Sequence, residues 1–366
     1  MRPATETELA EIVRAASGPL RIRGGGTRSL GAATTGALLE TGGLSGISLY
    51  EPGALTLVAG AGTPLAEVEA ALAAENQRLP FEPMDMRALL GVEGIPTVGG
   101  MVAANASGPR RIAVGACRDS LIGVRFVDGQ GRIVKNGGRV MKNVTGYDLV
   151  KLMAGSWGTL GVLTECSFKL LPVPEMQATL VSAAMTPDAA VACMSDALGT
   201  AYEVNAATRD TEGRVCLRLE GFSEQIRYRK AALAEALGGD WQLVEGADSQ
   251  ALWRDIRDVT AFAGQPGDVW RISVKPSDAA ALVAKIAAPV QMDWGGGLIW
   301  ALVPEGTDLR AKLGPIAGHA TLVRASDPTR TRLPAFHPEP APIAALAQGL
   351  RAKFDPRGVL NPGLMG

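Results

Sequence analysis

A run of small residues with one amide side chain is the segment of this sequence best suited to bind a ligand. It occupies positions 95–108 and reads Ile-Pro-Thr-Val-Gly-Gly-Met-Val-Ala-Ala-Asn-Ala-Ser-Gly. Such a run buries little apolar surface, so it is not the composition of an amphipathic core helix. Small side chains let backbone N–H groups approach a ligand closely and form a concave nest for an anion. Taken alone, a tightly packed turn is the alternative interpretation.

Two further glycine clusters strengthen the ligand interpretation. Residues 23–28, Arg-Gly-Gly-Gly-Thr-Arg, follow an expected strand at 20–22. Residues 155–162, Gly-Ser-Trp-Gly-Thr-Leu-Gly-Val, follow an expected helix at 147–153 and precede an expected strand at 163–170. A mononucleotide needs only one such loop, so three favour an extended ligand with several anionic or planar parts. Three unrelated turns in a chain with 45 glycines remain the alternative.

Composition and charge narrow the class of protein. The chain has 366 residues, of which 47% are hydrophobic, and a net charge of −1. Its basic residues form no block, so we expect no nucleic-acid partner. No apolar run approaches the ~18 residues of a transmembrane helix. The first residues lack the apolar stretch of a signal peptide, so we expect a cytoplasmic protein.

Residues that could bind a metal are few. The cysteines are Cys117, Cys166, Cys193 and Cys216, and no two of them lie within four residues of each other. Iron–sulfur and zinc spacings are therefore absent, and reduced thiols are expected. The two histidines, His319 and His337, cannot by themselves supply a site of several imidazole ligands, and we predict no metal site.

The order of expected elements divides the chain into three parts. Residues 1–172 read as one α+β unit that contains all three glycine loops, with a helix capped by Thr5 and another capped by Thr63. A Pro-Val-Pro sequence at 172–174 marks a boundary, and alternating strands and helices over 173–327 indicate a smaller α+β domain. Residues 328–342 carry five prolines and are expected to form an extended connector before a last helix at 343–354.

Several motifs, in order, resemble the vanillyl-alcohol-oxidase-type (PCMH-type) FAD-binding family. They are the three glycine segments, Gly146-Tyr-Asp, and the tail Phe354-Asp-Pro-Arg-Gly-Val-Leu-Asn-Pro-Gly. Arg118-Asp-Ser-Leu-Ile-Gly-Val and the segment from Lys142 to Lys151 are similar to the FAD-binding subunits of bacterial glycolate oxidases. The resemblance implies a two-lobed FAD-binding domain (1–172), a cap domain (173–327), and a connector and tail (328–366) that return to the FAD domain.

The same resemblance implies the residues that bind FAD. Gly24 to Thr27 would hold the pyrophosphate through backbone N–H groups, and a side chain at Gly25 would push into it. Gly158, Gly161 and Val162 would contact the adenosine or flavin end, and Asn361 would approach the isoalloxazine. The complete predicted set is Arg23, Gly24, Gly25, Gly26, Thr27, Pro83, Thr97, Gly99, Gly100, Ala104, Asn105, Gly108, Gly158, Gly161, Val162 and Asn361.

Departures from related sequences bear on the chemistry. Some relatives attach FAD covalently, either through a histidine in the first loop or through a cysteine before Pro-Thr-Val-Gly. In this chain Thr27 or its neighbours and Ile95 occupy these positions, and none of them can form such a bond. We therefore expect non-covalent FAD. The histidine-rich metal and substrate motif of the catalytic 2-hydroxy-acid dehydrogenases is also missing, and the catalytic residues stay unassigned. Gly60-Ala-Gly62 lacks the third glycine of a dinucleotide fingerprint, because position 65 is leucine.

The resemblance therefore implies an FAD-binding subunit of a glycolate oxidase (glycolate dehydrogenase) complex. It would take part in oxidising glycolate, a 2-hydroxy acid, to glyoxylate through flavin-mediated electron transfer. A catalytic FAD-linked subunit and an iron–sulfur subunit would be its partners, and the complex could hold it at the cytoplasmic face of the inner membrane. The alternatives are a non-catalytic FAD-binding scaffold and an autonomous flavin oxidoreductase. In the autonomous enzyme, Arg271 and Lys275 on one strand face would at most hold a carboxylate, and a solvated strand face is the favoured interpretation of these two residues.

Overall fold

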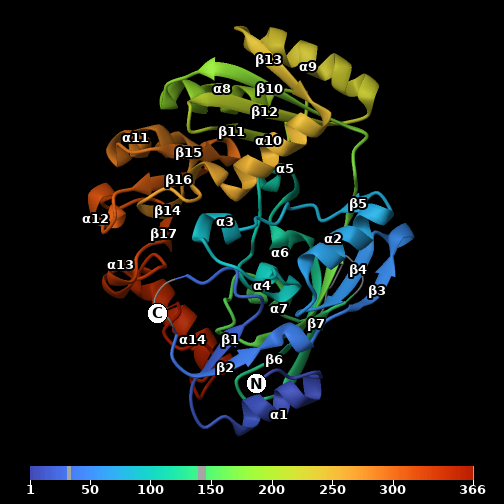
Figure 1. Ribbon diagram of the computed structural model, residues 1–366, viewed down its shortest axis with the longest axis vertical. Helices are drawn as coiled ribbons and strands as arrows, with labels where there is room; N and C mark the ends of the chain where they lie inside the picture. The colour runs from blue at the N-terminus through green and yellow to red at the C-terminus, as the bar shows by residue number, and fades with distance from the viewer. Residues whose placement is uncertain (31–33, 139–145, 366) are drawn as a thin grey trace.

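Two large β-sheets, of five and eight strands, organise the molecule beside two two-stranded sheets, β1-β2 and β5-β9. Figure 1 shows the computed structural model, which describes residues 1–30, 34–138 and 146–365. The smaller sheet belongs to the N-terminal part of the chain and the larger to the part after residue 175. The mixture of helices and strands confirms the expected α+β class. Residues 142–145 of one family motif lie outside the described residues.

The smaller sheet has five antiparallel strands in the order β3-β4-β8-β6-β7. Leu57, Phe126 and Phe168 are fully buried between it and helices α2, α4 and α7. The elements of this part are α1 (Glu6–Ala15), β1 (Leu20–Arg23), β2 (Ala37–Glu40), β3 (Ile47–Glu51), β4 (Thr56–Gly60), α2 (Leu65–Ala74), β5 (Gln77–Arg78), α3 (Arg87–Leu90), α4 (Val98–Ala103), α5 (Arg111–Val114), α6 (Cys117–Ser120), β6 (Leu121–Val127), β7 (Ile133–Gly137), α7 (Leu149–Met153), β8 (Val162–Lys169) and β9 (Leu171–Pro172).

Local capping explains where the first helices begin. Thr5 accepts a hydrogen bond from the Glu8 backbone at 3.1 Å, which confirms the predicted cap of α1. The predicted cap of α2 is wrong. Pro64 is its N-cap, and the Thr63 hydroxyl instead accepts from the Gly46 backbone at 2.9 Å, tying the start of α2 to the turn before β3.

The larger sheet has eight strands in the order β13-β10-β12-β11-β15-β16-β14-β17. Helices α8, α9 and α11 pack on one face through a core that includes Met194, Ile226 and Ile286, and α10 packs on the other through Trp253 and Ile256. The elements are β10 (Met176–Ala184), α8 (Pro187–Gly199), β11 (Ala206–Arg209), β12 (Arg214–Gly221), α9 (Ser223–Leu237), β13 (Trp241–Glu245), α10 (Gly246–Asp258), β14 (Asp268–Ser273), α11 (Pro276–Ile286), β15 (Val290–Asp293), β16 (Leu298–Val303), α12 (Leu309–Leu313) and β17 (His319–Arg324).

One expectation for this sheet is corrected. Because β14 ends at Ser273 and Lys275 is the N-cap of α11, Arg271 and Lys275 do not share a strand face. Pro276 at the first helical position favours the switch from strand to helix, since its fixed φ suits a helix start.

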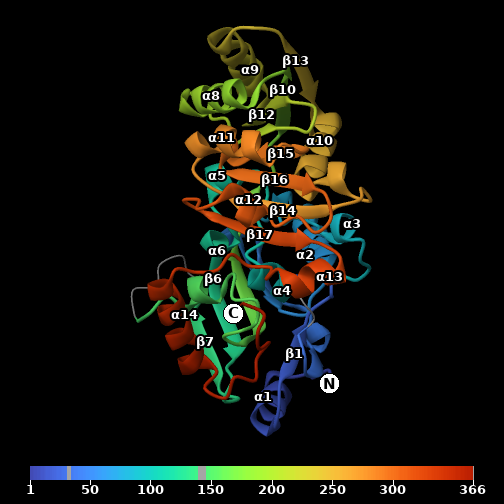
Figure 2. The same cartoon turned by 90° about the vertical axis from the view of Figure 1, so that its left-hand side faces the viewer.

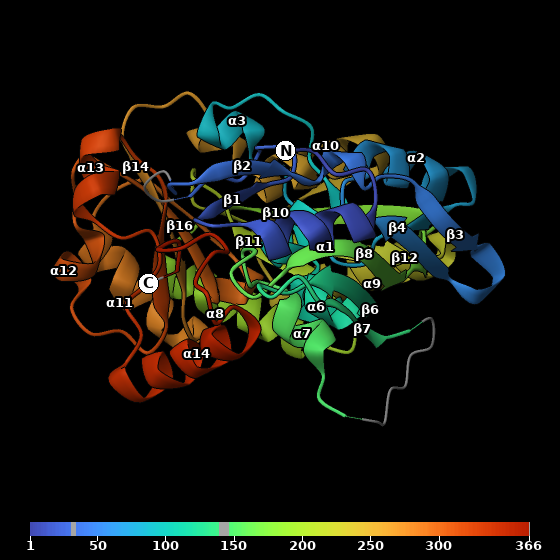
Figure 3. The same cartoon turned by 90° about the horizontal axis from the view of Figure 1, so that it is seen from below.

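The C-terminal segment returns to the N-terminal part. The expected extended connector contains a helix, α13 (Asp327–Arg332), because Pro328 occupies its first turn rather than interrupting it. The next helix, α14 (Ala341–Phe354), lies at the same end of the molecule as β6 and β7 (Figure 2). Its last residue, Phe354, contacts Phe126 of β6, with ring centroids 6.0 Å apart. Beyond it, Leu360 bridges to Leu20 of β1 in parallel. Figure 3 looks onto this end of the molecule, at α1 and α14.

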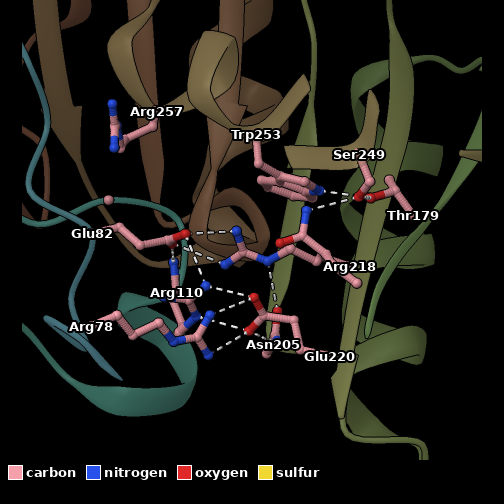
Figure 4. A network of polar contacts seen from close by, with 12 residues as sticks. Arg78, Glu82, Arg110, Thr179, Asn205, Arg218, Glu220, Ser249, Trp253 and Arg257 are labelled. Carbon is pink, nitrogen blue, oxygen red and sulfur yellow. Dashed lines mark hydrogen bonds and ion pairs between the residues drawn. The ribbon is translucent and has the colours of Figure 1, made fainter. Parts of the chain in front are cut away.

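A buried ion network joins the two sheet-based parts (Figure 4). Arg218 of β12 donates to both Glu82 oxygens at 2.8 and 2.9 Å, and its guanidinium lies 4.7 Å from the centroid of the Trp253 ring. Glu220 of the same strand accepts from Arg110 at 2.6 Å and from Arg78 at 2.8 Å. Because Glu82, Arg110 and Arg78 come from the N-terminal part, these bonds fix the larger sheet against it.

The charges of the network depend on each other. Burial alone would raise the pKa of Glu82 and of Glu220. Arg218 and Arg110 outweigh burial for both carboxyls and hold each pKa below its ordinary value. A buried ion pair that loses one partner leaves an uncompensated charge, so the network tolerates the loss of a single member poorly.

We expect Glu220→Gln to lower the free energy of unfolding by about 3–5 kcal/mol, because it leaves Arg110 and Arg78 buried beside a neutral amide. Urea and thermal denaturation measure the change. A carboxyl with a lowered pKa stabilises the fold above its unfolded pKa, so the difference from wild type should be complete at pH 7 and shrink below about pH 4. Glu212→Gln, which removes an exposed partner of Arg214, should change stability by less than about 0.5 kcal/mol. Equal effects of the two substitutions would contradict this account.

Candidate cofactor site

The three glycine segments meet around one cavity of about 530 Å³. Residues 21–30 form one wall at the end of β1, α4 forms a second, and the loop before β8 forms a third. Most of the predicted cofactor residues line it, namely Arg23, Gly24, Gly25, Gly26, Thr27, Thr97, Gly99, Gly100, Gly158, Gly161, Val162 and Asn361.

Short backbone contacts hold these segments together. Thr97 caps α4 by accepting from the Gly100 backbone at 3.3 Å, and Gly99 donates to the Ala61 carbonyl at 2.7 Å. A Cβ on Gly25 would lie 1.6 Å from the Ile95 carbonyl oxygen. The glycine is therefore required because its loop packs against the backbone of the small-residue run. This corrects the sequence-based idea that a side chain there would point at the pyrophosphate.

The first loop keeps backbone donors available. The N–H groups of Gly25, Gly26 and Thr27 donate to no acceptor within residues 1–30, 34–138 and 146–365. Backbone N–H groups in folded proteins are nearly always paired, so three consecutive free donors in a cavity wall fit an anion such as a pyrophosphate.

The charge of the cavity wall also suits an anionic ligand. Four arginines, at positions 21, 23, 28 and 330, line the cavity together with one acidic residue, Asp327. Arg28 is only 9% exposed; its Nη2 donates to the Met84 carbonyl at 2.6 Å, while Nε and Nη1 have no hydrogen-bond partner. Burial lowers the pKa of this guanidinium. The surplus of positive charge and the free N–H groups fit the two phosphates of FAD.

Four predicted residues do not line the cavity: Pro83, Ala104, Asn105 and Gly108. Asn105, whose φ is 48°, accepts from the Arg118 backbone at 3.1 Å and so shapes the turn after α4. The Gly108 carbonyl accepts from the Trp294 indole at 3.1 Å, at the boundary with the larger sheet. Of the whole run, the residues that line the cavity are Thr97, Gly99, Gly100 and Ala103, and residues 104–108 do not.

Asn361 lines the cavity while its amide ties the tail in place. Its Oδ1 accepts from the Ile22 backbone at 2.7 Å, and its Nδ2 donates to the Trp157 carbonyl at 2.9 Å. The tail thus joins β1 to the third glycine loop, and the amide holds the cavity wall together.

The cavity also has lining residues outside the predicted set. Arg28 follows the first glycine loop directly, so its position alone could have indicated it. Asp327, Arg330 and Thr331 come from α13, which is far along the chain from all three glycine loops, and no local pattern connects them with those loops. The remaining missed residues are Arg21, Ile22, Ser29, Leu30, Thr34, Thr41, Ala61, Ala103, Trp157, Leu163 and Leu364.

Comparison with known proteins identifies the class. Residues 1–137 match the family model of the FAD-binding domain. A solved structure of alkyldihydroxyacetonephosphate synthase superposes with a TM-score of 0.69 over 99% of this chain and 76% of that one, at 13% identity, and so shares the fold. The fold, the cavity and the sequence define an FAD-dependent oxidoreductase, and the chain belongs to the PCMH-type FAD-binding family.

Within this family, the chain is 37% identical to the glycolate oxidase subunit GlcE of Escherichia coli (strain K12), over 95% of this chain and 92% of that protein. It is also 40% identical to the glycolate oxidase subunit GlcD of Bacillus subtilis (strain 168), but over only 32% of this chain and 23% of that one. A D-lactate dehydrogenase of Archaeoglobus fulgidus is 32% identical over 56% of this chain and 44% of its own length.

Neither a cluster of metal ligands nor a membrane-spanning helix occurs within the described ranges. The described ranges contain no group of three or more His, Cys, Asp or Glu residues that could hold a metal ion. Cys117, Cys166 and Cys216 are buried and Cys193 is half-buried, all as free thiols. Burial raises the pKa of Cys216 to about 12, so its thiolate is strongly disfavoured. In the same ranges, none of the helices has the length and apolar character needed to cross a bilayer.

We expect the FAD to be released intact by acid or heat. Thr27 lines the cavity and Ile95 lies beside the first loop, and neither side chain can form the histidyl or cysteinyl bond of covalent relatives. Acid precipitation should leave the yellow colour and its absorbance in the supernatant. Flavin that stays with the precipitate, or FMN in place of FAD, would contradict the expectation.

We expect Gly25→Ala to weaken FAD binding by about tenfold or more, because the added Cβ cannot coexist with the Ile95 carbonyl and the loop must move. The ratio of flavin to protein absorbance and titration of the FAD-free protein measure the effect. Gly53→Ala is the matched control, since its Cβ would meet nothing within 4 Å and Gly53 lies outside the cavity. Full flavin occupancy in Gly25→Ala would show that the loop can move without affecting the site.

Proposed function

We propose that this chain is the FAD-binding subunit of a glycolate oxidase complex that oxidises a 2-hydroxy acid, glycolate, to the 2-oxo acid glyoxylate. The observation that carries the proposal is the convergence of three glycine segments on one cationic cavity, in a chain similar to a glycolate oxidase subunit over 95% of its length.

The residues of the cavity have distinct roles in this proposal. Bound FAD would supply two-electron acceptance and one-electron release. The free N–H groups of Gly25, Gly26 and Thr27 would bind the pyrophosphate, and Arg28 would keep positive charge behind the ligand. The ligand could lie close to the start of α4 because the residues there, Thr97, Gly99 and Gly100, are small. Asn361 would hold the third loop against β1.

The removal of a proton from the substrate is assigned to a partner. Proton transfer by a positioned base contributes about 10²–10⁴ to a rate, and histidine is the commonest base. Neither His319 nor His337 lines the cofactor cavity, and the Nδ1 of His337 already accepts from the Ala320 backbone at 3.2 Å. A catalytic FAD-linked subunit would therefore perform most of the chemistry, and an iron–sulfur subunit would carry the electrons onward. Through this complex the chain would lie in the cytoplasm, at the inner membrane.

Two alternatives differ in what the flavin does. In one, the FAD is structural and the chain is a scaffold for the other subunits. In the other, the chain is an autonomous oxidoreductase that needs no partner. The rates at which this chain's flavin is reduced, in the isolated chain and within the complex, distinguish all three.

We expect glycolate to bleach the flavin of the isolated chain very slowly or not at all, and to bleach it at a catalytically competent rate within the complex. Stopped-flow absorbance measures both rates, and the Gly25→Ala subunit in the same complex serves as control. A flavin that never changes redox state in the active complex would support the scaffold. Fast bleaching of the isolated chain would identify it as the dehydrogenase itself.

A further inference from the structure

Two arginines from different parts of the molecule meet at one indole ring. The guanidinium carbon of Arg111, on α5, lies 4.5 Å from the centroid of the Trp294 ring. That of Arg271, on β14 of the larger sheet, lies 5.1 Å from the same centroid. The two guanidinium carbons are therefore within about 10 Å of each other, a span that one carboxylate with two hydrogen bonds can bridge.

Neither guanidinium has an anionic partner. Within the described part of the chain, the side chains of Arg111 and Arg271 make no ion pair and no hydrogen bond, and the indole is their common contact. Most other half-buried arginines of this protein are satisfied. Arg310, which also stacks on a tryptophan at 4.8 Å, donates to the carbonyls of Ala320, Pro334 and Ala335.

The surroundings of the pair are polar on one side and apolar on the other. In the strand register, Arg271 lies opposite Trp300 of β16 and Thr321 of β17. Two residues further along β14, Ser273 lies opposite His319 of β17. Trp294 and Trp300 belong to the apolar cluster between the two sheet-based parts. Arg111 and Arg271 are both half-buried, so neither side chain is fully removed from solvent.

The arginines repel each other in the absence of an anion. Burial and, to a smaller extent, the charge of Arg111 lower the pKa of Arg271 to about 10, while Asp293 acts in the opposite direction. Asp293 is no ion-pair partner: its Oδ1 accepts from the Trp294 backbone at 2.7 Å, and burial raises its pKa to about 7. An anion between the guanidiniums would relieve this repulsion.

We propose that Arg111 and Arg271 form a binding site for the carboxylate of a small 2-hydroxy acid, with Trp294 as its floor. Arginine suits this role, because its planar fork donates two parallel hydrogen bonds to a carboxylate and also stacks on an aromatic ring. The carboxylate part of the inference stands on these contacts alone, whereas the 2-hydroxy acid part rests on the proposed function. The site joins α5 to β14, so an occupied site would also strengthen the contact between the two parts of the molecule.

The test measures binding of oxalate and glycolate to the purified FAD-containing chain by calorimetry and tryptophan fluorescence. Both acids should bind saturably, while glycolamide, which lacks the carboxylate, should not. Arg111→Gln and Arg271→Gln should each weaken oxalate binding by about tenfold or more, and the double variant should lose less than the product of the two effects, since both contact one anion.

Control variants separate this site from general electrostatics and from misfolding. Arg310→Gln removes an equally charged, tryptophan-stacked arginine and should leave oxalate affinity within about twofold. Arg271→Lys keeps the charge and should retain part of the affinity if Arg271→Gln loses its flavin or its circular dichroism. No saturable binding by wild type, or equal losses in Arg310→Gln and Arg271→Gln, would overturn the proposal. Arginine-dependent oxalate binding in a protein whose flavin stays oxidised in the active complex would keep the site and refute the proposed function.

Discussion

The buried ion network at the boundary of the two sheet-based parts is the constraint on which the arrangement of the molecule depends. Arg218 is 1% exposed and the Glu220 side chain 4% exposed, so neither charge can be solvated if its partners move away. The desolvation of a lone buried charge costs several kcal/mol, more than most single apolar contacts provide. The larger sheet must therefore sit where Glu82, Arg110 and Arg78 can reach it.

This fixed boundary explains how residues distant in the sequence become neighbours at the two sites. It places Trp294 against the Gly108 carbonyl at one end of the small-residue run, while the other end of that run forms the cofactor cavity. The same boundary brings α5 up to β14, so that Arg111 and Arg271 share an indole. The return of α13 and the tail then closes the cavity with residues from the far end of the chain.

Arginines in this protein fall into two groups with different meanings. Arg78, Arg110 and Arg218 are matched by carboxylates and stabilise the fold, so they indicate no ligand. Arg28, Arg111 and Arg271 are buried or half-buried without a carboxylate, and each lies at a cavity wall or at the boundary between the parts. Unmatched positive charge is costly to bury, so where a fold retains it, a ligand is the simplest compensation.

The sequence by itself determined the family, the cofactor and the glycine loops that line the cavity. Glycine and other small residues are required wherever backbone approaches backbone or ligand, and this requirement is local, so a motif such as residues 23–28 carries it intact. Most of the fold was also readable, because hydrophobic periodicity and capping residues such as Thr5 act over a few positions. The cap of α2 was misassigned because the Thr63 hydroxyl bonds to the distant Gly46 instead.

Only the tertiary structure decided that Asn105 and Gly108 lie outside the cavity lining and that α13 supplies part of the cavity wall. It also decided that Arg271 shares the Trp294 ring with Arg111 and does not share a strand face with Lys275. These outcomes depend on which surfaces are buried against each other, and burial is a property of the packed molecule that local sequence does not encode.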